Sequence, residues 1–217
     1  MEALRAALRK AVSEQMETDA AHDLAHLDRV WSNCQDIAEG EHAPDLRILL
    51  GAAYLHDLVN LPKDDPHRNQ ASRRAAEQAG PILTNLGFAD PEVAGAQHAI
   101  ATHSFSAGLE PETLEARILR DADRLDAIGA IGIGRTFAVA GSLKLALYDP
   151  QDPFAVYRSL DDRAWALDHW PMKLFRLPEG MTTKTGRAIA TNRVAEMRVF
   201  AENLASEIGT SLPDSWR

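Results

Sequence analysis

Apolar residues recur at helical spacing through most of the chain, and this periodicity restricts the fold to helices. Leu4, Leu8 and Val12 follow one another at intervals of four in the opening segment, so they share one face of a helix. Residues 24–39 and 185–208 continue the same repeat over longer stretches. We find no run in which β-branched and polar residues alternate, the pattern of a half-buried strand. The sequence therefore predicts an all-α fold, as a single compact helical domain.

Proline and cap residues predict where the remaining helices begin. Proline suits the first turn of a helix, and it follows the cap residue Asp90 in Asp90-Pro91 and Glu110 in Glu110-Pro111. Gly80-Pro81 is expected to break or kink a helix that runs through Gln78. Further helices are expected to start near Pro44, Asn69, Asp90 and Glu110, the one from Asp90 running to about His103, whereas residues 61–68 form a loop and residues 148–170 are irregular.

Charge and cysteine content exclude several classes of protein. The formal net charge is -9, which argues against bulk binding to nucleic-acid backbones because they require clustered cations. Cys34 is the only cysteine, so neither an intramolecular disulfide nor a cysteine-rich zinc site can form. The first residues lack the apolar core of a signal peptide, and no stretch is apolar over a membrane-spanning length. We expect a cytoplasmic protein that does not enter a membrane.

The adjacent pair His56-Asp57 closes an apolar run and is the strongest indication of a functional site. Both side chains are costly to desolvate unless they are hydrogen-bonded or bound to something charged. A divalent metal would account for them, because neutral imidazole and carboxylate are its ordinary ligands. The alternative is a helix-terminal histidine beside an aspartate cap. Suitable partners flank the pair, with histidines at 22 and 26 and aspartates at 121, 123 and 126.

The best arrangement takes one histidine from the second helix, the pair from the end of the third, and one aspartate from a later helix. Three helices would then supply nitrogen and oxygen ligands to one ion. His22 and His26 share a helical face, as in zinc proteases. However, Asp23 is shorter than the glutamate those enzymes use, and no third ligand follows at their spacing. The mixed ligand set suits Mn, Fe, Co, Ni, Zn or Mg.

These residues resemble the HD-domain superfamily of metal-dependent phosphohydrolases, whose pattern is a His, a His-Asp pair and a distant Asp. His26, His56, Asp57 and Asp123 match those four positions. The resemblance implies an HD-type domain over residues 1–217, with a motif-bearing core at about 20–136 completed by C-terminal helices. It also implies that the four residues hold one divalent ion, with manganese expected first.

The segment Asp121 to Thr136 further resembles a bacterial branch that includes nucleoside triphosphate pyrophosphohydrolases. This resemblance implies a small-nucleotide substrate, hydrolysed from triphosphate to monophosphate and pyrophosphate. A nucleoside monophosphate phosphatase, a cyclic-nucleotide phosphodiesterase and a non-catalytic metal- or nucleotide-binding regulatory module remain alternatives. Oligomeric state is left open by the sequence.

Other residues are candidates for catalysis or substrate binding. Many members of the superfamily carry a carboxylate three residues beyond the paired aspartate, where this chain has Asn60. An amide cannot act as a general base, so this route to activating water is not expected here. Asp57, His98 and His103 are the candidates for catalysis. For the two histidines the alternatives are a structural role, contact with phosphate, or ligation of a second metal. Cations expected to contact substrate phosphate are Lys63, Arg68, Lys184 and Arg187.

Two further groups of residues have expected structural roles. Gly129, Gly132 and Gly134 are interpreted as sites of close helix packing rather than as a phosphate-binding loop, because no strand precedes them. Asp121 and Asp126 are expected to accept hydrogen bonds or to orient a histidine.

Overall fold

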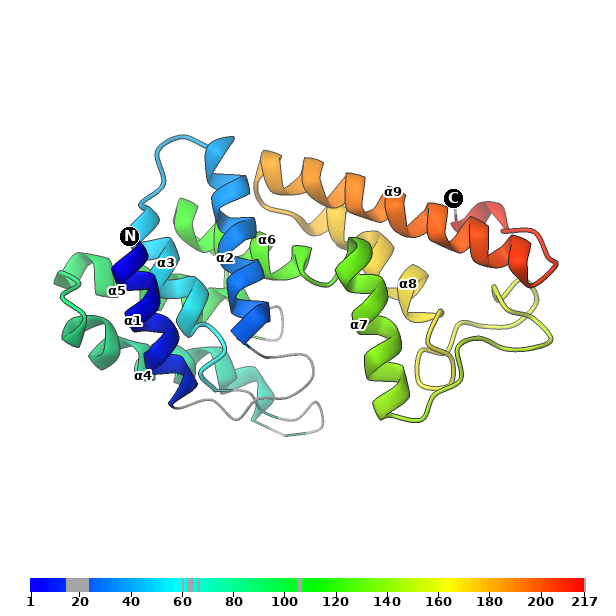
Figure 1. Ribbon diagram of the computed structural model, residues 1–217, viewed down its shortest axis with the longest axis horizontal. Helices are drawn as coiled ribbons and strands as arrows, with labels where there is room; N and C mark the ends of the chain where they lie inside the picture. Colours follow the sequence, from blue (N-terminus) through cyan, green and yellow to red (C-terminus); the bar gives the residue numbers. More distant parts are fainter. Residues whose placement is uncertain (15–23, 60, 62–64, 66, 105–106, 217) are drawn as a thin grey trace. The chain divides into compact units, whose positions relative to one another are not determined.

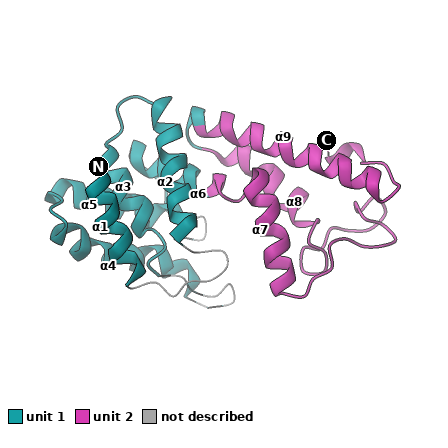
Figure 2. Cartoon of the chain, viewed as in Figure 1, with its two compact units in different colours: residues 1–123, 182–185 teal, residues 124–181, 186–217 magenta. Residues whose placement is uncertain are grey.

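The computed structural model describes residues 1–14, 24–59, 61, 65, 67–104 and 107–216. Its chain forms two compact units, shown in different colours in Figure 2. Unit 1 comprises residues 1–123 and 182–185, and unit 2 comprises residues 124–181 and 186–217. Within the described ranges the only β-pairing is an isolated bridge between Ala146 and Trp165. The all-α prediction is confirmed, whereas the prediction of one domain over the whole chain stays a prediction.

Unit 1 is built around α3 (Leu46–Leu55), which contacts α1, α2, α4 and α5. Every residue from Leu49 to Leu55 is buried, because helices surround α3 instead of covering one face. A Cβ atom at Gly51 would lie 2.7 Å from Leu83 Cδ2, so glycine permits the close approach of the neighbouring helix. The surrounding helices of Figure 1 are α1 (Glu2–Ser13), α2 (Leu24–Glu39), α4 (Ala71–Asn85) and α5 (Asp90–His103).

Polar side chains fix α1 to the two helices that follow it. The phenol of Tyr54 donates a hydrogen bond to Asp28 Oδ1 at 2.5 Å, and Arg5 Nε donates to the Tyr54 oxygen at 2.8 Å. Arg5 and Arg9 both form ion pairs with Asp28. Burial raises the pKa of Tyr54 and the hydrogen bond to Asp28 adds to it, so the phenol remains a donor. This network joins α1, α2 and α3.

Helix ends differ from the sequence prediction at four places. Asp45 caps α3, accepting hydrogen bonds from the backbone of Arg47 and Ile48, so Pro44 precedes the helix. Pro81 lies inside α4; it is exposed, so water can solvate the carbonyl that loses its donor. Ala89 replaces Asp90 as the N-cap of α5, its N–H donating to Glu92 Oε2. Helix α6 (Leu114–Leu125) starts later than Glu110, because Thr113 caps it.

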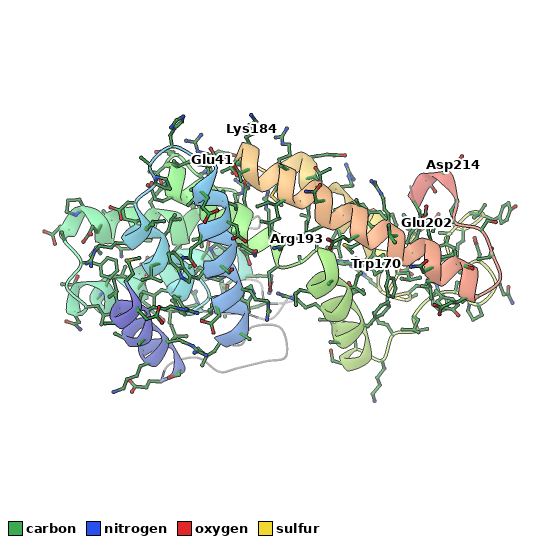
Figure 3. The ribbon with its side chains drawn as sticks, turned by 45° about the horizontal axis from the view of Figure 1, so that its top comes forward. Glu41, Trp170, Lys184, Arg193, Glu202 and Asp214 are labelled. Carbon is green, nitrogen blue, oxygen red and sulfur yellow. The ribbon has the colours of Figure 1, made fainter. Side chains whose placement is uncertain are left out.

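A short segment distant in sequence completes unit 1. The Asp121 carboxylate accepts hydrogen bonds from the backbone N–H and the hydroxyl of both Thr182 and Thr183, at 2.7 to 3.0 Å. Glu41 Oε1 accepts a hydrogen bond from the Thr185 N–H at 3.1 Å. Figure 3 shows Lys184, the first residue of α9 (Lys184–Glu207), with Glu41 nearby. Most of α9 then belongs to unit 2.

Unit 2 contains α7 (Gly129–Ser142), α8 (His169–Met172), the 3-10 segments Leu174–Gly180 and Asp214–Trp216, and α9 from Gly186 onward. Its core is aromatic. The ring centroid of Trp170, labelled in Figure 3, lies 5.8 to 6.1 Å from those of three phenylalanines. Two of these phenylalanines, Phe137 and Phe200, also lie 6.2 Å from each other. Trp170 is fully buried, so it lies in the core of unit 2. The three phenylalanines are Phe137, Phe175 and Phe200.

The glycines near the start of α7 have different roles. Gly129 opens the helix with φ 73°, a conformation that favours glycine. A Cβ at Gly132 would lie 2.2 Å from the carbonyl oxygen of Ala127, which lies in the turn before α7, so glycine permits a close approach within the chain there. Helix packing at Gly132 stays a prediction. Gly134 has nothing within 4 Å of such an atom. None of the helices in the described part of the chain combines the length and the apolar character needed to cross a membrane.

Candidate metal centre

Side chains from four helices of unit 1 meet at one end of α3. His26 comes from the first turn of α2, and His56 is the C-cap of α3, with Asp57 directly after it. His103 is the last residue of α5, and Asp123 lies in the last turn of α6. Because α3 packs against both α2 and α5, its C-terminal end is held between the other two histidine-bearing helices.

Two of the histidines are oriented by their own helices. His56 Nδ1 lies 2.9 Å from the Ala53 carbonyl oxygen, and His103 Nδ1 lies 2.7 Å from the Ile100 carbonyl oxygen. A carbonyl accepts only, so Nδ1 carries the proton in both rings and a neutral ring then has its lone pair on Nε2. His56 and His103 therefore present Nε2 as a ligand atom.

The ligand atoms form two overlapping groups. In the first, Asp123 Oδ1 lies 3.7 Å from His26 Nε2 and 3.8 Å from His56 Nε2. In the second, Asp57 lies 3.5 Å from His56 Nε2 and 3.8 Å from His103 Nε2. Asp57 Oδ2 is also 3.6 Å from His26 Nε2, which links the groups. These separations exceed hydrogen-bonding distance and leave room for an ion between the ligand atoms.

The donor set fits a divalent cation. His56 Nε2 is completely buried and has no hydrogen-bond partner within the described ranges. A buried polar atom without a partner is costly, and bonding to a cation would remove that cost. The carboxylates of Asp57 and Asp123 are the charged partners that such an ion requires. His26, His56, Asp57 and Asp123 could therefore hold one divalent metal, with His103 beside them.

The protonation states also suit metal binding. Burial lowers the pKa of His56, and the nearby imidazoles of His103 and His26 lower it further, against the opposing effect of the carboxylates. Burial opposes ionisation of Asp57, but the three imidazoles outweigh it and hold the pKa of Asp57 well below its usual range. A neutral imidazole and an ionised carboxylate are the forms that coordinate a cation.

Comparison with known proteins identifies the family. The HD domain profile matches residues 23–128, which contain all five residues of the cluster. The uncharacterized protein YpgQ of Bacillus subtilis (strain 168) is 33% identical over 197 residues, covering 88% of this chain and 87% of that protein. This chain belongs to the HD-domain superfamily. The resemblance noted in the sequence is thereby confirmed.

Solved structures extend the similarity over nearly the whole chain. The crystal structure of B. subtilis YpgQ in complex with ADP has a TM-score of 0.72 at 29% identity and covers 96% of each chain. An HD-superfamily hydrolase from Bacillus thuringiensis also has a TM-score of 0.72 at 29% identity, covering 95% of this chain and 96% of that one. The similarity to these structures therefore extends to the C-terminal helices beyond the profile match.

The aspartates that flank Asp123 in sequence bind other residues and are not part of the metal-ligand groups. Asp121 accepts hydrogen bonds from Thr182 and Thr183, and it belongs to neither group of ligand atoms. Asp126 is buried and pairs with Arg135 in unit 2. Both positions therefore have the hydrogen-bonding role expected for them.

The remaining candidate residues lie in different surroundings. His98 Nε2 accepts a hydrogen bond from the Glu112 N–H at 3.1 Å, so His98 fixes the α5–α6 connection, and it belongs to neither ligand group. Arg68 donates to the Leu61 carbonyl at the end of the connection after Asp57. Lys184 is exposed in unit 1, and Arg187 is exposed in unit 2. Lys63, His22 and Asn60 lie outside the described residues.

Arg120 is a residue that the sequence interpretation missed. It lies on α6 three residues before Asp123, and its side chain is only 12% exposed. Residues three apart share one face of a helix. The spacing between Arg120 and Asp123 could therefore have indicated from the sequence that both lie on the same side of α6.

Proposed function

We propose that this HD-domain chain is a divalent-metal-dependent phosphohydrolase acting on small nucleotides. Its preferred reaction is hydrolysis of a (deoxy)nucleoside triphosphate to the monophosphate and pyrophosphate. The observation that carries the proposal is the convergence of His26, His56, Asp57 and Asp123 around buried, preoriented ligand atoms. Support for a nucleotide comes from the similar protein YpgQ, whose structure was determined in complex with ADP.

The four ligand residues would hold one cation, with manganese as the first candidate. When bound there, a divalent ion supplies Lewis acidity towards water and a phosphoryl oxygen. The carbonyl of Ala53 fixes the His56 ring, which limits the reorganisation needed for binding. Asp57 is charged and only 18% exposed, so it retains its electrostatic effect close to the reacting group.

His103 and several cations outside the cluster are assigned to the substrate. His103 Nε2 lies beside Asp57, where the imidazole can contact attacking water or the phosphoryl group. Attack at the α-phosphorus breaks the bond to the α–β bridging oxygen, and that oxygen leaves with pyrophosphate. Lys63 and Arg68, which follow Asp57 in the chain, are assigned to the phosphate tail, with Lys184 as a further cation. Participation of Arg187 and of His98 stays a prediction from the sequence.

The test is a product assay on the purified chain across nucleoside triphosphates, nucleoside monophosphates and cyclic nucleotides. Pyrophosphate and phosphate are measured separately, with Mn, Co, Ni, Mg and Zn each supplied alone. We expect pyrophosphate and nucleoside monophosphate in equal amounts from triphosphates, with Mn among the activating ions. Release of phosphate from monophosphates, or opening of cyclic diesters, would instead assign one of the other two hydrolytic reactions.

A matched variant distinguishes hydrolysis at this site from contaminating activity. Asp123→Asn removes one carboxylate charge from the cluster, whereas Asp36→Asn removes one from the exposed side of α2. Turnover should disappear in the first variant and persist in the second. Nucleotide binding with metal but without turnover under every condition would reject the enzymatic proposal in favour of a regulatory module.

A further inference from the structure

Arg120 and Asp123 lie on the same side of α6. Residues three apart in a helix have Cβ atoms roughly 5–6 Å from each other. Asp123 Oδ1 is within 3.8 Å of both His26 Nε2 and His56 Nε2. The Arg120 side chain therefore leaves α6 next to the residue that carries the helix's contribution to the metal centre.

The guanidinium of Arg120 lacks the partners that its burial requires. Its side chain is 12% exposed, and the buried Nε has no hydrogen-bond partner in the described part of the chain. Its nearest carboxylate there is Glu110, at 3.8 Å, and Glu110 is itself 88% exposed. This separation is too long for a hydrogen bond, and an ion pair with so exposed a partner is weak.

Three other shielded arginines each have a partner, either a hydrogen-bond acceptor or an aromatic ring. Arg158 is 19% exposed and binds Asp168 with two N–H groups. Arg5 binds both Tyr54 and Asp28. Arg198, whose Nε also lacks a hydrogen bond, lies over the Phe175 ring at 5.2 Å. Arg120 differs because a nearly buried cation, on the side of α6 that carries Asp123, has among the described residues only a distant, solvated counter-ion.

We propose that Arg120 binds a phosphate group of the substrate; this assignment rests on the phosphohydrolase function proposed above. A phosphate oxygen pair matches the fork of N–H donors on a guanidinium. Binding would supply the missing acceptors close to the carboxylate end of the metal site. Glu110, beyond hydrogen-bonding distance and largely in solvent, is the counter-ion that an incoming phosphate replaces.

Arg120 also explains how an acidic chain can retain a phosphate group at a site lined with carboxylates. Asp57 and Asp123 repel an anion, and only a bound cation or a fixed positive side chain can offset that repulsion. The position on a helix in unit 1, rather than on a loop, fixes the charge relative to Asp123. Unlike Lys63 and Arg68, Arg120 would contact the phosphate nearest the cluster.

The test measures binding of inorganic phosphate to the manganese-loaded chain by isothermal titration calorimetry, so it does not depend on turnover. Arg120→Gln should weaken phosphate binding by about tenfold or more, because a charge-assisted bidentate contact is lost. Arg120→Lys should lose less, because it keeps the charge without the fork. Manganese content, measured by elemental analysis, should stay at the wild-type value in both variants.

The matched control is Arg117→Gln, which makes the same change one turn earlier on α6 at an exposed arginine. Its phosphate affinity should remain within about twofold of wild type. Equal phosphate affinity in wild type and Arg120→Gln, including no measurable binding to either, would overturn the assignment. If Arg120→Gln does not fold, wild-type affinity in Arg120→Lys overturns it. If Arg120→Gln binds phosphate more weakly than wild type but the wild-type chain does not hydrolyse nucleotides, the proposed reaction is rejected and the anion site is not.

Discussion

The paired substitutions Asp121→Asn and Asp123→Asn should separate folding from metal binding on one helix. Two residues apart on α6, the carboxylates point about 160° away from each other. Asp121 is fully buried and accepts from four donor groups of Thr182 and Thr183. Asp123 is 31% exposed and lies among the imidazoles of the metal centre.

The expected loss of stability in Asp121→Asn follows from the hydrogen bonds that Asp121 accepts. Asparagine at position 121 keeps one acceptor oxygen. Its NH2 group would, however, face the N–H and hydroxyl donors of Thr182 and Thr183 without accepting from them. Losing charge-assisted bonds to two or more buried groups should cost about 2–4 kcal/mol in the free energy of unfolding. For a chain of this size the midpoint of thermal unfolding should fall by roughly 5–15 °C. Asp121→Asn should nevertheless bind its full equivalent of metal at temperatures where it is folded.

Asp123→Asn should show the opposite pattern. No described neighbour forms a hydrogen bond with Asp123, so the metal-free variant should unfold within about 1 kcal/mol of wild type. Its bound metal should fall below stoichiometry because a charged ligand is gone. Stability and metal content can be measured on the same preparations. Thermal unfolding with chelator gives the stability of the metal-free chain, and elemental analysis after dialysis against manganese gives the bound metal. A folded Asp121→Asn without metal, or a metal-replete Asp123→Asn, would refute the assignment.

The helices were predictable because their apolar repeats are long. Residues 24–39 were expected to be helical, and α2 spans Leu24–Glu39. Their ends were less predictable, because several residues near a helix start can provide the same cap. Glu110-Pro111 carries a proline typical of a helix start, yet the Thr113 hydroxyl accepts from the Ala116 N–H and α6 starts after it. Tertiary packing chooses between such candidates, and local sequence does not contain that information.

The place of residues 182–185 in unit 1 was not predictable for a similar reason. Asp121 binds the backbone N–H groups of Thr182 and Thr183, which lie about sixty residues later in the chain. Neither threonine has a distinctive sequence neighbourhood. A contact of this kind is recognised only when the donors and the acceptor are placed in space.

The metal centre shows the same contrast between spacing and environment. Residue types and order indicated the pair His56-Asp57 with one further histidine and one further aspartate, and the resemblance to the HD-domain pattern identified these as His26 and Asp123. The sequence left His98 and His103 equivalent. The hydrogen bonds separate them, since His103 presents Nε2 beside Asp57 whereas His98 holds the backbone of the α5–α6 connection.

Three further predictions test ligand identity, helix docking and pH dependence. His56→Ala and Asp57→Ala should each abolish metal binding and turnover together, measured by elemental analysis and product release; stoichiometric metal in both would contradict the assignment. Tyr54→Phe should lower the free energy of unfolding by about 1–3 kcal/mol, because Asp28 and Arg5 lose a shared partner, and it should be non-additive with Arg5→Ala in a double-mutant cycle. Finally, the pKa of His56 is lowered mainly by burial, so below about pH 6.5 the unfolded chain binds a proton that the folded metal-free chain does not. Stability measured by denaturant unfolding with chelator should therefore fall as pH decreases through about 6.5, and this contribution is present in full only above that value. His56→Asn removes the group and should flatten that part of the profile, whereas an unchanged slope in the variant would show that another group controls it.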